Sequence, residues 1–284
     1  MKILVTGVKG QLGYDVLKEL NKRGFNDVVG IDKEELDITK EDDVNSFITQ
    51  QPFDIVFHCA AYTAVDAAED HKELCYDVNV NGTKYISKAC KKVDATLFYV
   101  STDYVFDGKG DNPFSINDKP NPVNYYGETK YLGEKEVLKH TEKHFIIRIS
   151  WVFGINGHNF VKTMLKLGKT KNELSVVSDQ IGSPTYTYDL AKLLCDMMMT
   201  NHYGIYHATN EGFCSWYDFA CEIFNQANID INVNPLSTEH YPTKATRPKN
   251  SRLSKRSLID EGFNLLPTWQ DALNRYLKEL GEVK

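Results

Sequence analysis

The stretch that decides the fold is the first thirteen residues, which read Met1-Lys-Ile-Leu-Val-Thr-Gly-Val-Lys-Gly-Gln-Leu-Gly13. A short, strand-like apolar run leads into three glycines, and a helical pattern follows. Each glycine has a mechanical reason: Gly7 permits a tight strand-to-helix turn, Gly10 lets the backbone approach a pyrophosphate, and Gly13 lets the helix lie close to the sheet. The strand before and the helix after therefore predict a dinucleotide site rather than a glycine-rich turn without a ligand.

Short apolar runs alternate with helix-length amphipathic stretches through the first half of the chain, which is the pattern of βα units that feed a parallel sheet. We expect strands near 2–6, 27–31, 54–59, 95–101 and 144–150. We expect helices near 11–23, 41–50, 72–92 and 125–140, each long enough for a right-handed crossover. The predicted fold class is α/β, a doubly wound parallel sheet of the Rossmann type.

Regularity fades after about residue 150, where glycines and prolines divide the chain into shorter pieces. We expect residues 1–150 to form a dinucleotide-binding domain that includes the catalytic helix. Residues 151–284 would form mainly a smaller α/β lobe for the substrate, with the chain crossing between the two. No long linker separates the parts, so the sequence predicts one continuous body.

Composition narrows the ligand classes. The chain has 284 residues, of which 42% are hydrophobic and 25% charged, as in ordinary globular proteins. A formal charge of -6 leaves no broad basic surface for nucleic acid, and no apolar run approaches the length of a membrane span. We therefore expect a small phosphorylated ligand, met by a local cluster of positive groups, and a protein that works as a monomer or homodimer.

The cysteines and histidines indicate the cellular compartment of the protein and whether it binds a metal ion. The six cysteines are scattered, with no Cys-x-x-Cys pair and no secretory leader before them, which predicts reduced thiols in a cytoplasmic protein. The eight histidines show no close ligand spacing such as His-Glu-x-x-His. We therefore expect no metal site.

Asp32 closes the second expected strand, 19 residues past Gly13. An acidic side chain at this place can hold a ribose hydroxyl of the adenosine, although an ordinary solvated loop acid is the alternative. Lys33 beside it, together with Lys9 in the glycine turn, could equally neutralise a 2′-phosphate and favour NADPH. The sequence leaves the choice between NADPH and NADH open.

Tyr126 and Lys130 place a phenol and an ammonium one helical turn apart on the same face. Spacing alone does not select this pair, because three other Tyr-x-x-x-Lys matches occur: Tyr14/Lys18, Tyr131/Lys135 and Tyr188/Lys192. Only Tyr126 begins an expected helix that follows the strand ending in Ser101-Thr102-Asp103-Tyr104. That strand ends at the sheet edge where open α/β folds bind ligands, so we select Tyr126 and Lys130.

The chemistry that these residues support is carbonyl reduction. Thr102 would hold the substrate carbonyl while Tyr126 donates a proton to the developing alkoxide. A free phenol has a pKa of about 10, and we expect the Lys130 ammonium and an oxidised nicotinamide to lower it. Asn79 either relays protons or is tied to a backbone bend.

These residues are similar to those of extended short-chain dehydrogenases that act on nucleotide sugars. Longer segments narrow the resemblance to the dTDP-4-dehydrorhamnose reductase family, and they extend over nearly the whole chain. They are Ala60–Glu69, Ser101–Gly108, Asn124–Lys130, Ser150–Phe153, Asp179–Thr185, Ser215–Ala220 and Arg247–Leu253.

The resemblance implies reduction of the C4 ketone of dTDP-4-dehydro-L-rhamnose by NAD(P)H. It implies that Thr102, Tyr126 and Lys130 are catalytic. The residues that it places against the cofactor, beside the glycines above, are Gly10, Gln11, Leu12, Asp37, Ile38, Ala61, Tyr62 and Thr63. It places Asp103, Tyr104 and Trp151 against the sugar nucleotide, with a core tryptophan as the alternative for Trp151. Arg247 and Arg252 either bind the substrate diphosphate or are solvated.

Two competing hypotheses stay open. One is another reductase or epimerase of the same family with a different nucleotide sugar, against which Trp151 and the Arg247–Leu253 segment argue. The other is a non-catalytic regulatory subunit that still holds a dinucleotide, since proteins resembling this reductase serve as partners of methionine adenosyltransferase. The presence of Thr102, Tyr126 and Lys130 together argues against that second hypothesis.

Overall fold

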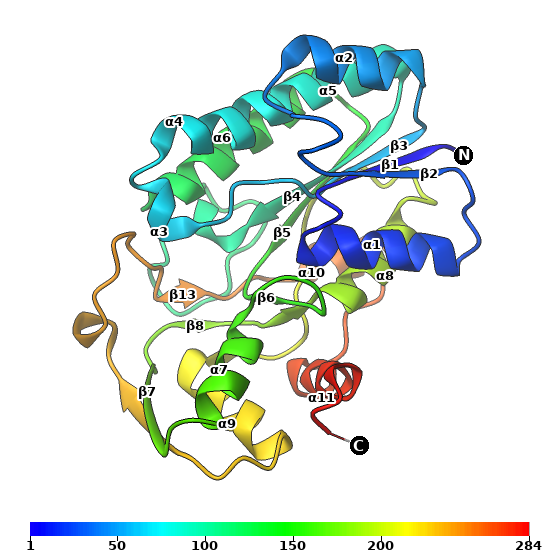
Figure 1. Cartoon of the computed structure of the whole chain (residues 1–284). Helices are drawn as coiled ribbons and strands as arrows, with labels where there is room; N and C mark the ends of the chain where they lie inside the picture. The colour runs from blue at the N-terminus through cyan, green and yellow to red at the C-terminus, as the bar shows by residue number, and fades with distance from the viewer. Residues whose placement is uncertain (284) are drawn as a thin grey trace.

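The central feature of the computed structural model, which describes residues 1–283, is a six-stranded parallel sheet (Figure 1). Its strand order is β10-β5-β4-β3-β1-β2, and every neighbouring pair is parallel. The strands are β1 (Ile3–Thr6), β2 (Val28–Ile31), β3 (Ile55–His58), β4 (Thr96–Thr102), β5 (His144–Ile149) and β10 (Gly204–His207). The predicted doubly wound α/β fold is confirmed.

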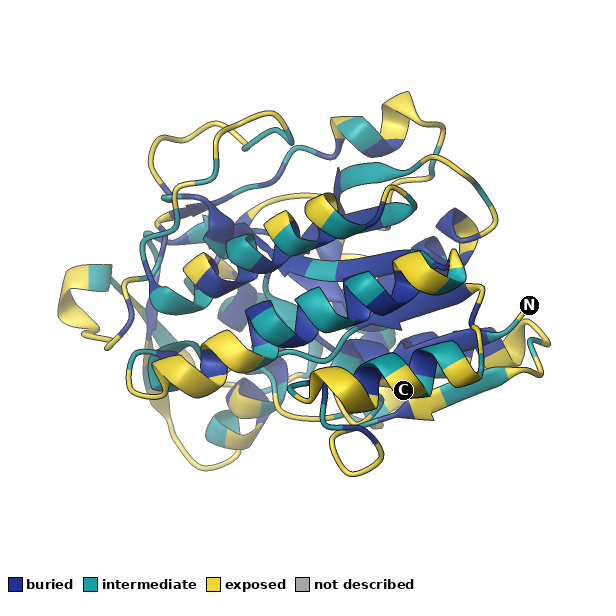
Figure 2. Ribbon diagram, turned by 90° about the horizontal axis from the view of Figure 1, so that it is seen from above, coloured by how far each residue is buried: buried dark blue, intermediate teal, exposed yellow. Residues whose placement is uncertain are grey.

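Helices cover both faces of this sheet. Figure 1 shows α2 (Glu41–Gln50), α5 (Thr83–Val93) and α6 (Tyr125–His140) on one face, and α1 (Gln11–Lys22) and α8 (Thr187–Met197) on the other. The apolar residues of α1 recur every fourth position, so one stripe of this helix packs against the sheet. Figure 2 shows the outcome: the sheet is largely buried except at its edge strand β2, and the outer faces of the helices carry exposed residues.

The structure differs from the sequence expectations in two elements. The single helix expected over 72–92 is divided into α4 (Lys72–Tyr76), a π-helical turn (Asp77–Gly82) and α5. A π-turn inserts an extra residue, and here it lets the Asn79 side chain reach the backbone of Tyr62. The sixth strand, β10, was not among the expected strands, because its four residues carry too little periodicity to stand out.

The remaining elements form a second lobe at one end of the sheet. Its helices are α7 (Phe160–Gly168), α9 (Trp216–Gln226) and α11 (Trp269–Leu280), and they share one apolar cluster. Its strands are β6 (Val152–Phe153), β7 (Glu173–Val177), β8 (Ile181–Gly182), β9 (Thr185–Tyr186), β11 (Cys214–Ser215), β12 (Asn232–Leu236) and β13 (Asn250–Ser251). Short helices complete the chain: α3 (Val65–Ala68), α10 (Arg256–Asp260) and 3-10 turns at Asp103–Val105 and Thr238–His240. Within residues 1–283, no helix has the length and apolar character to cross a membrane.

Candidate active site

The glycine turn joins β1 to α1 with very little space around it. Gly7 has a φ of +72°, and a Cβ there would lie 2.8 Å from the backbone nitrogen of Ala60. A Cβ at Gly13 would lie 2.2 Å from the carbonyl oxygen of Gly7, so the helix can approach the strand only without one. The N-cap of α1 is Gly10, and no side chain caps this helix end. Its first amides are therefore available to a phosphate group.

Asp32, directly after β2, lies against this turn. Its carboxylate accepts hydrogen bonds from the backbone nitrogens of Lys9, at 3.0 Å, and Lys33, at 2.8 Å. The ammonium of Lys9 forms an exposed ion pair with Glu34, at 2.9 Å. Asp32 therefore connects the end of β2 to the glycine turn, at the place where an adenosine ribose is expected.

Of the other residues expected at the cofactor, Gln11 and Leu12 begin α1, and the rest lie on two loops. Asp37 accepts hydrogen bonds from the backbone and hydroxyl of Thr39, which lower the pKa of its carboxyl, and Ile38 is buried. In the Ala61–Thr63 segment, the Tyr62 amide donates to Asn79 Oδ1 at 2.8 Å, while Asn79 Nδ2 donates to the Tyr62 carbonyl at 3.1 Å. Of the two interpretations of Asn79, this geometry favours the backbone bend.

Thr102 and Tyr126 lie together at the carboxyl end of β4, and Lys130 follows Tyr126 by one turn of α6. Thr102 is the last residue of that strand, and Tyr126 is the second residue of α6. The Thr102 hydroxyl donates to Asp103 Oδ1 at 3.0 Å and accepts from the Tyr104 amide at 3.2 Å. It also lies close enough to the Tyr126 phenol to oppose the rise of that phenol's pKa.

Burial governs the electrostatics of this group. Burial, reinforced by Asp103, raises the pKa of the Tyr126 phenol well above its ordinary value. Burial lowers the pKa of Lys130 to about 7, although Glu134 opposes the change. In the protein alone, burial outweighs the lowering of the phenol's pKa that we expect from Lys130 and an oxidised nicotinamide, because desolvation disfavours both charged forms; that expectation stays a prediction. A phenol that stays protonated at neutral pH is, however, the form that can donate a proton.

Trp151 lies at the start of the second lobe in an unusual backbone conformation, with a φ of +50°. Its indole stacks on that of Trp216, with ring centroids 3.7 Å apart and planes inclined by 14°. A Cβ at Gly182 would lie 2.8 Å from Trp151 Cε2. The indole is half-buried rather than in the core, so part of its surface is free to contact a ligand.

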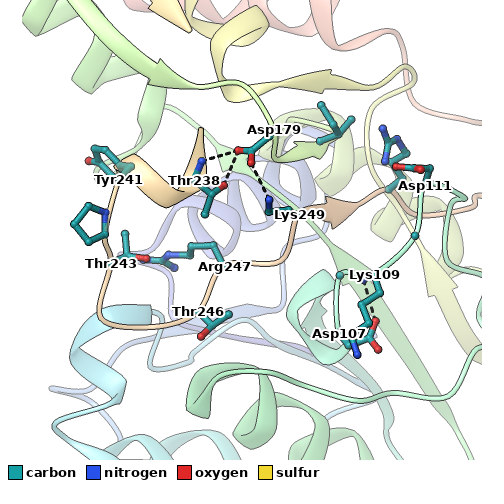
Figure 3. Close-up of a pocket in the computed structure, with 15 residues that line it drawn as sticks. Asp107, Lys109, Asp111, Asp179, Thr238, Tyr241, Thr243, Thr246, Arg247 and Lys249 are labelled. Carbon is teal, nitrogen blue, oxygen red and sulfur yellow. Dashed lines mark hydrogen bonds and ion pairs between the residues drawn. The ribbon is translucent and has the colours of Figure 1, made fainter. Parts of the chain in front are cut away.

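A pocket of about 690 Å³ lies between the 107–111 loop and the 238–252 segment, and Figure 3 shows the side chains around it. Arg247 and Arg252 both line it. Arg247 pairs with Asp66 at 2.5 Å and donates to the Tyr104 hydroxyl at 3.3 Å. Arg252 contacts only the side-chain oxygen of Asn250, at 3.0 Å, and has no acidic partner among residues 1–283. Its charge is therefore available to an anion.

Several side chains at this site were not predicted. Asp66 and Trp216 lie in segments that carried the resemblance, but nothing in their local sequence assigned them a role. Asp179 accepts from Thr238 and pairs with Lys249 at 3.1 Å across the pocket wall, a contact between residues far apart in the chain (Figure 3). The described part of the chain holds no group of three or more His, Cys, Asp or Glu residues that could hold a metal ion.

The fold and the site together define a class of protein. The sheet is doubly wound, a glycine turn follows β1, a threonine ends β4, and the next helix carries a Tyr-x-x-x-Lys pair. These are the features of a dinucleotide-binding protein of the extended short-chain dehydrogenase class. Residues 1–282 match the family model described as the RmlD substrate binding domain, and the chain belongs to that family.

Full-length relatives agree with this assignment. The chain is 42% identical to the spore coat polysaccharide biosynthesis protein SpsK of Bacillus subtilis, over 98% of this chain and 97% of that one. Its structure is similar to a dTDP-4-dehydrorhamnose reductase from Clostridium acetobutylicum, with a TM-score of 0.96, 43% identity and coverage of 99% and 100%. It is also similar to the dTDP-4-dehydrorhamnose reductase of Bacillus anthracis in complex with NADP, with a TM-score of 0.95, 43% identity and coverage of 98% and 100%.

Proposed function

We propose that this protein is an NADPH-dependent dTDP-4-dehydrorhamnose reductase, which converts the C4 ketone of dTDP-4-dehydro-L-rhamnose into the hydroxyl of dTDP-L-rhamnose. The observation that carries the proposal is the placement of Thr102 and Tyr126 together at the carboxyl end of β4, with Lys130 one turn further along α6, in a chain of this family. Residues 1–150 would bind mainly the dinucleotide, and residues 151–284 mainly the sugar nucleotide.

The residues around the glycine turn fit a dinucleotide. The uncapped start of α1 would bind the pyrophosphate, and Asp32 the adenosine ribose. Gln11, Leu12, Asp37, Ile38 and the Ala61–Thr63 segment would line the rest of the cofactor. NADP in the Bacillus anthracis relative supports NADPH over NADH, and Lys9 and Lys33, whose backbone nitrogens donate to Asp32, could meet a 2′-phosphate.

The reduction adds one hydride and one proton to the carbonyl. The hydride comes from the reduced nicotinamide when it is bound. The Thr102 hydroxyl orients the carbonyl oxygen, and the Tyr126 phenol, held protonated by its burial, donates the proton to that oxygen. Lys130, one turn away, stabilises the phenolate that this transfer leaves.

The substrate would lie between the catalytic group and the 690 Å³ pocket. Arg252, which has no acidic partner among the described residues, and Arg247 would bind the diphosphate. Asp103 is buried beside Thr102, whose hydroxyl donates to its Oδ1, and it would contact the sugar nucleotide next to the catalytic group. Tyr104 and Trp151 would contact the sugar through their rings.

The test follows NADPH oxidation with a panel of 4-keto nucleotide sugars that differ in the base and in the sugar. We expect turnover with dTDP-4-dehydro-L-rhamnose and a much smaller kcat/KM with the others. Turnover of a different nucleotide sugar would instead support another reductase or epimerase of the family. NADPH binding without turnover of any member would support a regulatory subunit.

Two coarser features belong to the same proposal. All six cysteines are free thiols, which suits a protein of the reducing cytoplasm. We propose that the protein acts there as a monomer or homodimer, with a small-molecule substrate as its partner rather than a nucleic acid or a membrane. Fractionation of the native cell and light scattering of the pure protein test the two points separately.

A further inference from the structure

Tyr99 lies beneath the catalytic helix and contacts Lys130 in two ways. The Lys130 ammonium nitrogen is 4.1 Å from the centroid of the Tyr99 ring. The Tyr99 hydroxyl donates to the backbone carbonyl of Lys130 at 3.1 Å. Tyr99 is fully buried, and Gly133 makes room for it, because a Cβ there would lie 2.2 Å from the phenol oxygen. The ring therefore has one position available to it.

We propose that Tyr99 is the positioning residue of Lys130: the face of its ring holds the ammonium in the charged form by a cation–π contact. A ring face attracts a cation most strongly where water is excluded, and Lys130 is 2% exposed. The proposal rests on the proposed reductase function, in which Lys130 must be charged to stabilise the Tyr126 phenolate.

The other groups around Lys130 do not supply a free negative charge. Glu134, one turn further along α6, has both carboxylate oxygens occupied, because Arg148 binds them at 2.9 and 2.7 Å. Ser101 donates to the same carboxylate at 2.5 Å. Within residues 1–283, no hydrogen bond or ion pair to the Lys130 ammonium is formed by a protein acceptor.

The remaining titratable groups near the ammonium are neutral. Burial raises the pKa of the Cys59 thiol to about 12 and also raises that of Cys75. Burial lowers the pKa of His58 to about 3, and the nearby Lys130 charge adds to this effect. The Tyr126 phenol is protonated at neutral pH. Glu134 favours the charged lysine from a distance, and the face of the Tyr99 ring is the contact with the ammonium itself that does so.

The position of Tyr99 in β4 explains how the strand can do this. Side chains of a strand alternate between its two faces, so Tyr99 and Ser101 both point toward α6. Thr102 ends the same strand at the active site. One strand therefore places both the hydroxyl that orients the carbonyl and the ring that holds the lysine.

The chain offers a matched control one turn further along α6. The Lys135 ammonium is 4.5 Å from the Tyr131 ring centroid; the Tyr131 side chain is half-buried and that of Lys135 is exposed. This pair is also a lysine ammonium over a tyrosine ring at a similar distance, but it lies outside the catalytic group. Its loss removes a cation–π contact from the same helix without touching Lys130.

The test compares Tyr99→Phe with variants in which position 99 carries a fluorinated phenylalanine. Increasing fluorination keeps the shape of the ring and removes the negative electrostatic potential of its face. The readout is the pKa of Lys130 in the free protein, followed by NMR with ¹³C-labelled lysine and assigned with Lys130→Arg. We expect Tyr99→Phe to keep this pKa. Full fluorination should lower it by about one unit, because a desolvated cation–π contact is worth about that much.

Turnover provides the second readout. At pH 7.5 we expect kcat to fall several-fold with fluorination, to stay near wild type in Tyr99→Phe, and to be unchanged in Tyr131→Leu. An unchanged Lys130 pKa across the fluorinated series, or an equal shift in Tyr131→Leu, would overturn the proposal. Because the NMR titration needs no substrate, a shifted pKa in a protein that turns over no 4-keto nucleotide sugar would reject the reductase function and retain the Tyr99 contact.

Discussion

Single residues at this site are held by specific close contacts. Trp151 shows this best. A φ of +50° is unfavourable in conformational free energy for a tryptophan, so contacts with the surrounding residues must stabilise it. The stack on Trp216 and the contact with Gly182 provide that support. The indole is thereby kept in one orientation before any ligand arrives, which reduces the entropy lost on binding.

Gly182→Ala tests this orientation. The added methyl group would meet the rigid indole at 2.8 Å, so Trp151 must move. We expect the KM for the sugar nucleotide to rise about tenfold, equivalent to about 1.4 kcal/mol, while the Kd for NADPH stays unchanged. Steady-state kinetics and a fluorescence titration measure the two quantities. An equal weakening of both ligands would show that Trp151 serves the fold and not the substrate.

Tyr126→Phe tests the proton donor. The substitution removes the phenol oxygen and keeps the ring, so we expect kcat to fall at least about 100-fold with NADPH binding intact. Tyr125→Phe, at the adjacent position, is the control, because its ring faces Lys72 and not Thr102. A wild-type kcat in Tyr126→Phe would exclude the assigned role.

At the scale of elements, the start of α6 is the part that the site depends on most. Asn124 caps this helix by accepting from the Gly127 amide at 2.8 Å, and its Nδ2 donates to the Thr246 carbonyl at 2.8 Å. One side chain thus joins the catalytic helix to the segment that carries Arg247 and Arg252. The cap sets the direction of the helix turn that bears Tyr126.

Asn124→Ala should therefore lower stability and activity together. We expect a loss of about 1 kcal/mol in the free energy of unfolding, which is usual for an N-cap, and a clear decrease in kcat. Thr268→Ala removes the equivalent cap of α11, whose side chain accepts from the Asp271 amide. That control should lose similar stability in urea titrations but keep its kcat. A normal kcat in Asn124→Ala would mean that the cap does not position Tyr126.

At the scale of the whole molecule, α1 and α8 are joined by a buried carboxyl group. Asp15, on α1, accepts from the hydroxyl of Thr187 at the start of α8, and its other oxygen is buried without a partner in the described chain. Burial raises the pKa of Asp15 to about 6. A carboxyl whose pKa is higher in the folded protein stabilises the fold most at low pH, and this contribution is lost as the pH rises through the folded value.

The pH dependence of Asp15→Asn follows from this sign. Between about pH 4 and pH 6 the wild-type protein should lose stability relative to the variant, by up to about 3 kcal/mol, and the difference should level off above pH 6. Denaturant titrations across this pH range give the free energy of unfolding of each protein. The difference between the two proteins isolates Asp15, because the other titrating groups are the same in both. A difference independent of pH would show that Asp15 titrates normally in the folded state.

The sequence allowed much of the fold and part of the site to be predicted. Short apolar runs placed β1 to β5 to within one or two residues, because the central strands of a parallel sheet covered on both faces are buried along their whole length. The helix over 72–92 was predicted without its π-turn, because Asn79 bonds to a loop 17 residues away. The rise that burial causes in the pKa of the Tyr126 phenol could not be predicted, because the degree of burial is not visible in local sequence.

The sequence by itself determined what depends on near neighbours: the glycine turn, the βα alternation and the spacing of Tyr126 and Lys130 along one helix. The tertiary structure decided what depends on residues brought together from far apart. It placed Tyr99 under Lys130, 31 positions later, and Asp66 against Arg247, 181 positions later. Backbone conformation and helix period are local properties, whereas burial and electrostatic partners exist only once the chain has folded.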